Sequence, residues 1–337
     1  MLYVTTCNHQ DAFTTNHVLT QSAGADMGLY LPLRFPELSG KEIQKLTDMS
    51  FGQCVARMLN LFFSGRLNSW DVDFSIGRYP VRMEQPAYRI LMTETWHNPN
   101  WQYGHLEKNL RELLCAQADA PGNWVSIAIR MAVLAGILGN PEIQGRGPVD
   151  ISVVCGDFTL PISAWYLRKM GFPIGNIICC CNENNSFWEL LCNGQMHTDM
   201  TAVSTVVPEA DVALPVNLER LIYECGGATE AERYRDCCKN GTVYSVTDDM
   251  LEKLRTGLYA CVISSNRVET TIPNAYKTYQ YVLTPSSALA YSGLLDYRTK
   301  TGITRTALVI CDRNPVCDAA AIAKVMEISV ADLNKMI

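Results

Sequence analysis

The spacing of apolar residues along the chain predicts an alternation of helices and strands. One apolar stripe, which predicts a helix over 105–117, consists of Leu106, Leu110, Leu113 and Leu114. Short uninterrupted apolar runs predict buried strands at 150–155, 176–181, 259–263 and 306–311. Strands that are apolar on both faces and alternate with helices are typical of a parallel sheet. We therefore expect an α/β fold of three layers, with a parallel sheet flanked by helices.

Capping residues predict where several helices begin and end. Ser39 with Glu42, and Thr229 with the glutamate three residues later, have the spacing of a capping box. Gly241 is expected to end the second of these helices. Thr247, followed by two aspartates, is expected to begin another. Further helices are predicted over 51–62, 124–138, 286–297 and 318–326, with one ending at 170 and a strand over 88–92.

Composition limits the class of protein. Charged residues make up 18% of the chain and hydrophobic residues 48%, as in a globular protein with a sizeable core. The net charge of −6, with no cluster of lysine and arginine, argues against a nucleic-acid partner. No apolar run is long enough to span a bilayer, and residues 1–7 lack the pattern of a secretory signal. We expect a cytoplasmic protein with no membrane or nucleic-acid partner.

The cysteines are numerous but do not predict a metal site. There are 14 cysteines, adjacent to one another only at 179–181 and 237–238, and none forms a Cys-x-x-Cys pair. Residues 179–181 lie in a predicted strand, where successive side chains point to opposite faces and cannot converge on one ion. We expect free thiols that pack as small apolar residues in a reducing compartment.

Six segments occur in the same order as the motifs of one enzyme family. Residues 24–32 resemble G-x-x-D-G-G-L-Y-V-P, 123–124 the Asn-Trp of S-I-N-W-A-R, 169–175 K-x-M-G-L-P-I-G, 182–185 N-E-N-D, 217–221 N-F-E-R-L and 285–288 P-H-T-A. These are motifs of threonine synthase, a pyridoxal phosphate (PLP) enzyme of amino-acid biosynthesis. The resemblance covers nearly the whole chain and implies fold type II of the PLP enzymes, the tryptophan-synthase-beta-like fold.

The segment 96–105 resembles the lysine-bearing motif of that family, Phe-His-Gly-Pro-Thr-x-Ala-Phe-Lys-Asp. His97 matches, Trp96 and Tyr103 take the two aromatic positions, and Gly104 falls where the family has its lysine. Glycine has no amine, so it cannot form the Schiff base on which this kind of PLP catalysis depends. The resemblance thus implies a family member without catalytic residues, and we expect that PLP binding is lost.

Two further parts of the family's cofactor site are altered. The phosphate-holding G-N-F-G loop reads Gly156-Asp157-Phe158-Thr159, which adds a carboxylate where an anion would bind and removes a glycine that permits close approach. The strand end T-A-H-P, whose hydroxyl contacts the pyridine nitrogen, begins here with Asp312. With His97, these residues form the remnant of the family's cleft.

The largest difference is an absence. The family's S-G-D-T-G loop and most of its small substrate domain have no counterpart after about residue 117. We therefore predict an N-terminal threonine-synthase-like subdomain over 1–85 and a large α/β domain over 86–337 with the small domain largely deleted. A site without that domain would lose the water-excluding wall that PLP chemistry requires.

Two residues near Gly104 offer alternative chemistry. Lys108 lies one helical turn after Gly104 and could act as a substitute Schiff-base lysine, although a solvent-facing role is simpler. His97 could act as an acid–base residue in new chemistry, although no nucleophile with an activating base is visible beside it.

The sequence leads to three functional hypotheses. The first is a non-catalytic threonine-synthase-like protein with a binding, regulatory or scaffolding role, whose partner is a second copy or a related biosynthetic enzyme. The second is a PLP-independent enzyme or a binder of a small amino acid-like metabolite in an altered cleft. The third is residual PLP-dependent activity of the threonine synthase type, which would be lyase-type chemistry.

Overall fold

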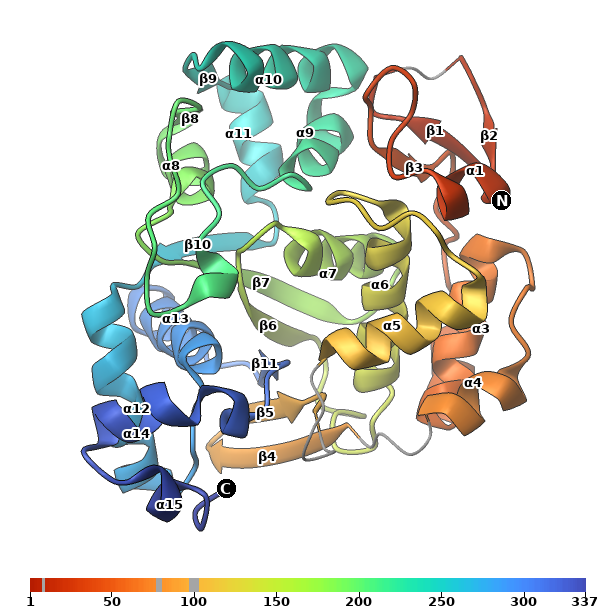
Figure 1. The fold of residues 1–337 in the computed structure, drawn as a ribbon. Helices are drawn as coiled ribbons and strands as arrows, with labels where there is room; N and C mark the ends of the chain where they lie inside the picture. Colours follow the sequence, from red (N-terminus) through yellow and green to blue (C-terminus); the bar gives the residue numbers. More distant parts are fainter. Residues whose placement is uncertain (8–9, 77–80, 97–102) are drawn as a thin grey trace.

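A computed structural model describes residues 1–7, 10–76, 81–96 and 103–337, and its centre is a six-stranded sheet (Figure 1). In spatial order the strands are β10 (Leu258–Val262), β7 (Ile174–Cys181), β6 (Val149–Val154), β11 (Ala307–Cys311), β5 (Ile90–Glu94) and β4 (Arg82–Ala87). The first five are parallel, and β4 pairs antiparallel with β5. The predicted parallel sheet is confirmed, with an antiparallel strand added at one edge.

Helices pack on both faces of this sheet and form two separate cores. One face is covered by α3 (Phe51–Phe63), α5 (Tyr103–Leu114), α6 (Trp124–Leu138) and α7 (Thr159–Lys169), and the other by α12 (Ser265–Tyr279), α13 (Pro285–Thr301) and α14 (Ala319–Met326). The short α15 (Val330–Leu333) packs on α14. Strand β7 serves both cores, because Cys179 and Cys181 face the first and Cys180 faces the second. The predicted alternation of these three cysteines is confirmed.

The N-terminal segment forms a small sheet of its own beside α6. Its elements are β1 (Leu2–Thr5), β2 (Phe13–Thr14), β3 (Tyr30–Pro32) and the helices α1 (Thr15–Thr20), α2 (Gly40–Thr47) and α4 (Ser69–Ile76). The Tyr3 ring packs edge-on against Trp124 of α6, and its hydroxyl donates a hydrogen bond to the Phe62 carbonyl at 2.6 Å. The domain division expected at residue 85 falls within β4, which already belongs to the central sheet.

A third group of elements lies beyond the β10 edge of the sheet (Figure 1). It comprises α8 (Ser186–Asn193), α9 (Leu218–Gly226), α10 (Ala228–Asn240), α11 (Asp248–Arg255), the paired strands β8 (Gln195–Met196) and β9 (Tyr244–Ser245), and a 3-10 turn, η1 (Pro208–Ala210). Within the residues that the structure describes, none of the helices is both long and apolar enough to cross a bilayer.

Most of the predicted boundaries are confirmed to within a few residues, and two are wrong. Helix α10 is capped by Gly227 rather than by Thr229. The reason is the tight turn from α9 to α10, for which Gly227 adopts a φ of +80° that side-chain-bearing residues rarely take. The strand expected over 88–92 begins only at Ile90, because Arg89 turns the chain between β4 and β5 with a φ of +56°.

Candidate functional site

A cleft of about 340 Å³ lies where the carboxyl ends of β6 and β11 meet the first turns of α5, α7 and α13. Ligands bind at this end of the strands in open α/β sheets. The cleft is lined by Tyr103, Gly104, Arg130, Val154, Cys155, Gly156, Asp157, Thr159, Leu160, Glu209, Val212, Ser286, Ile310, Asp312 and Arg313. Four of the residues expected at the site (Gly104, Gly156, Asp157 and Thr159) are therefore brought together, along with Asp312.

Gly104 is the second residue of α5 and lies open to the cleft. A Cβ atom built at this position would meet no other atom within 4 Å, so the glycine is not required by packing. Lys108 is exposed one turn further along α5 and is not part of the cleft lining. His97 lies outside the described residues. Gly104, which we expect at the position of the family's lysine, thus faces the cleft but provides no amine.

The loop 156–159, which we expect in place of the family's phosphate loop, is closed by the side chain of Asp157. The Asp157 carboxylate accepts hydrogen bonds from the Thr159 backbone N–H at 2.9 Å and from its hydroxyl at 2.8 Å. This carboxylate therefore uses a backbone donor at the start of α7 that a bound phosphate would otherwise take. Gly156 has a φ of +47°, and a Cβ there would lie 2.8 Å from the Glu209 carbonyl oxygen. Phe158, which we had expected in the cleft, is instead fully buried against Phe187.

Asn217 holds this loop from outside the cleft. Its side-chain amide donates to the Thr159 hydroxyl at 2.9 Å and to the Asp157 carbonyl at 3.2 Å. The buried Arg220 guanidinium donates in turn to the Asn217 side-chain oxygen and to the carbonyls of Tyr30 and Gly122. These contacts join the loop 156–159 to the N-terminal segment through Asn217 and Arg220.

The strand end at Asp312 carries a buried ion pair that the sequence did not suggest. Arg130 Nη1 lies 2.8 Å from Asp312 Oδ2, and the Thr95 hydroxyl donates to Asp312 Oδ1 at 2.9 Å. The Arg130 guanidinium also stacks on the Tyr103 ring, with Cζ 3.1 Å from the ring centroid. Burial raises the pKa of the Tyr103 hydroxyl, so this group stays protonated. The one signal for Arg130 in the sequence is that it is the only charged residue within 124–138.

A second ion pair lines the opposite part of the cleft. Arg313 contacts Glu209 Oε1 at 3.1 Å and Asp318 Oδ2 at 2.7 Å. Counting Asp157, the cleft holds three carboxylates and two guanidinium groups. Within the described part of the chain, no three His, Cys, Asp or Glu side chains are grouped to hold a metal ion.

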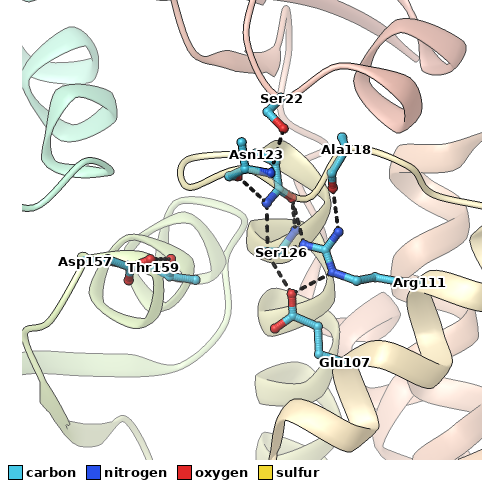
Figure 2. A network of polar contacts seen from close by, with 9 residues as sticks. Ser22, Glu107, Arg111, Ala118, Asn123, Ser126, Asp157 and Thr159 are labelled. Atoms are coloured by element: carbon cyan, nitrogen blue, oxygen red, sulfur yellow. Dashed lines mark hydrogen bonds and ion pairs between the residues drawn. The ribbon is translucent and has the colours of Figure 1, made fainter. Parts of the chain in front are cut away.

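Helices α5 and α6 follow one another directly, joined by residues 115–123 without a strand between them. Figure 2 shows the polar network that fixes this junction. Arg111 donates to Glu107 Oε1 at 2.9 Å, to the Ala118 carbonyl at 2.6 Å and to Asn123 Oδ1 at 3.0 Å. Ser126 of α6 completes it with a 2.6 Å hydrogen bond to Glu107. The connection between α5 and α6 is thus short and internally hydrogen-bonded.

Comparison with known proteins supports the resemblance seen in the sequence. Residues 2–77 match the family model described as Threonine synthase N terminus. "Threonine synthase-like 1" of Pongo abelii is 28% identical over 295 residues, which are 82% of this chain and 37% of that relative. Threonine synthase of Pseudomonas aeruginosa is 22% identical over 162 residues, 48% of this chain and 34% of that enzyme. The chain therefore spans little more than a third of the length of these relatives.

Solved structures show the same fold. A PLP-bound threonine synthase from Brucella melitensis superposes with a TM-score of 0.83 at 17% identity, covering 96% of this chain and 91% of that one. The yeast threonine synthase gives a TM-score of 0.84 at 14% identity, covering 97% of this chain and 90% of that one. The fold class expected from the sequence is confirmed.

Proposed function

We propose that this chain, which has the fold of solved threonine synthases, is a non-catalytic member of the threonine synthase family with a binding role. The observation that carries the proposal is the cleft at the strand ends, which is open but lacks the groups that would hold PLP. We argue the misfit from three features of this cleft: its missing amine, its filled helix N-terminus and its charge.

The amine is missing from the whole lining of the cleft. None of the lining residues in the described part of the chain is a lysine, and residues 97–102, which precede α5, contain none in the sequence. Lys108 is exposed away from the cleft lining. An internal Schiff base needs a lysine within bonding distance of the aldehyde carbon, so a side chain outside the cleft cannot substitute.

The helix N-terminus at which a phosphate would bind is also occupied, by the Asp157 carboxylate. Asp157 already accepts the hydrogen bond from the Thr159 N–H at 2.9 Å, and its negative charge repels a second anion. Across the cleft, the positive charges of Arg130 and Arg313 are neutralised by Asp312 and by Glu209 and Asp318. The residues present therefore do not fit PLP, and we derive no reaction step through it.

A binding role is favoured over mere loss of function because the cleft is open. A cleft of about 340 Å³ falls in the range of small-molecule pockets, which starts near ~300 Å³. A cleft filled by side chains would have contradicted a ligand-binding role. The partners that we expected from the sequence, a second copy or a related biosynthetic enzyme, remain part of the proposal and are measurable by light scattering and by pull-down with that enzyme.

Absorbance spectroscopy tests the loss of PLP chemistry. Wild-type protein mixed with PLP is expected to show only the spectrum of free PLP, whereas a threonine synthase run as a positive control shows the coloured aldimine. Gly104→Lys, which places an amine at the cleft, is the matched variant. A Cβ atom at 104 meets no other atom within 4 Å, so the cleft has space for this side chain. An aldimine spectrum in the wild-type protein would contradict the proposal.

A further inference from the structure

Two buried polar atoms at the cleft have no partner in the described part of the chain. They are the Tyr103 hydroxyl oxygen and Arg130 Nε, whereas Arg130 Nη1, which also makes no hydrogen bond, lies in the ion pair with Asp312. Both residues line the cleft, and their exposed fractions are only 7% and 8%. Buried polar groups in proteins are nearly always hydrogen-bonded, and an unpaired one destabilises the fold. A pair of orphaned donors beside an open cleft points to an acceptor that comes from outside the chain.

The two donors are held next to each other. The Arg130 guanidinium lies over the Tyr103 ring, and the Asp312 carboxylate lies beside its Nη1 rather than its Nε. The Tyr103 backbone N–H donates to the Asp312 carbonyl at 3.0 Å, which anchors the start of α5 to the strand end. A guanidinium N–H and a phenol O–H in one place match the two oxygens of a carboxylate, for which charge-assisted hydrogen bonds are strong.

The charge of the cleft selects against a phosphate. Its three carboxylates (Asp157, Glu209 and Asp312) exceed its two guanidinium groups by one charge. The first turns of α7 and α13, which line the cleft with Thr159 and Ser286, offset this excess with the positive ends of their dipoles. Near neutrality, such a cleft accommodates one negative charge far better than two.

We propose that this cleft binds a small unphosphorylated monocarboxylate, which Arg130 and Tyr103 hold through its carboxylate. The carboxylate accepts hydrogen bonds from Arg130 Nε and from the Tyr103 hydroxyl, while Arg130 Nη1 keeps its ion pair with Asp312. The site lies where the family's strand-end residue would meet the cofactor ring. The inference rests on the proposed binding role and specifies its ligand chemistry.

Ligand-observed NMR titrations with three probes test the site: propionate, its neutral isostere propionamide, and inorganic phosphate. The wild-type protein is expected to bind propionate at least tenfold more tightly than either of the other probes. Equal affinities for propionate and propionamide would overturn the proposal, because the site would then not distinguish a negatively charged carboxylate from a neutral amide. Tighter binding of phosphate would overturn it as well.

Three variants assign the contact to its residues. Tyr103→Phe removes a hydroxyl that has no partner within the protein, so its Tm should be unchanged or higher while propionate binds at least fivefold more weakly. Asp312→Asn removes a negative charge beside the Arg130 guanidinium and should strengthen propionate binding severalfold. Tyr88→Phe, in the exposed turn before β5, is the control and should change neither quantity.

The outcomes separate this inference from the proposed function. Unchanged propionate affinity in Tyr103→Phe would overturn the assigned contact even if the Tm fell, because the hydroxyl would then be structural only. No propionate binding together with no aldimine would overturn the carboxylate site and leave the non-catalytic assignment standing. An aldimine with PLP would overturn the assignment, whatever propionate does.

Discussion

The Asp157 carboxylate accepts a hydrogen bond from the Thr159 backbone N–H at 2.9 Å and so closes the first turn of α7 with a negative charge. In the family that this chain resembles, the same turn is built to receive a phosphate. In the proposed function, this one side chain both stabilises the helix and excludes a phosphate from the cleft.

Asp157→Ala is expected to lower the free energy of unfolding by about 0.5–2 kcal/mol, because it removes the acceptor at the start of α7. Asp157→Asn keeps a side-chain oxygen and should lose less. Urea denaturation of the three proteins measures the difference. An alanine variant as stable as the wild type would show that the carboxylate does not stabilise the helix.

Arg111→Met is expected to destabilise the protein by about 2–3 kcal/mol, because it leaves Glu107 and the Ala118 carbonyl without their charged donor in a partly buried network. Lys335→Ala is the control, since it removes an exposed ion pair with Asp332 and should change stability by less than about 0.5 kcal/mol. Both are measured by chemical denaturation. Similar losses in the two variants would contradict the role of the junction.

Part of the fold and of the candidate site could be predicted from the sequence, and part could not. The helix α6 was predicted with its observed bounds, because its apolar residues are continuous and Asn123 caps it. The helix α4 was missed, because Trp70 and Phe74 are exposed and leave no regular apolar stripe. The ion pair between Arg130 and Asp312 was beyond reach, since it joins residues far apart in the sequence through the packing of α6 against the strand ends.

The pH dependence of stability has a predicted sign at Glu219. Burial raises the pKa of this carboxyl group above its ordinary value of 4.5, despite the contacts with Thr6 and Arg235. A raised pKa contributes stability that is present below the unfolded pKa and is lost as the pH rises through the folded pKa. Relative to Glu219→Gln, which does not titrate, the wild-type protein should lose stability as the pH rises above about 4.5. Denaturation curves at several pH values check this, and the opposite trend would contradict it.

Thiol labelling should distinguish the exposed cysteines from the buried ones. Cys115 is exposed, whereas Cys54 is buried, and burial raises its pKa to about 12. Burial also raises the pKa of Cys179. Because the thiolate is the reactive form, a thiol reagent at pH 8 should modify Cys115 quickly and Cys179 only after unfolding. Mass spectrometry of the labelled peptides identifies the sites. Modification of Cys179 in the folded protein would contradict its place in the core.

Borohydride trapping tests most directly whether this fold has lost PLP chemistry. The wild-type protein and Lys108→Ala are incubated with PLP, reduced with borohydride and weighed intact by mass spectrometry. We predict no pyridoxyl adduct specific to the native fold, and the same low background of surface-lysine labelling in both proteins. A stoichiometric adduct in the wild-type protein that maps to Lys108 and disappears in Lys108→Ala would contradict the account.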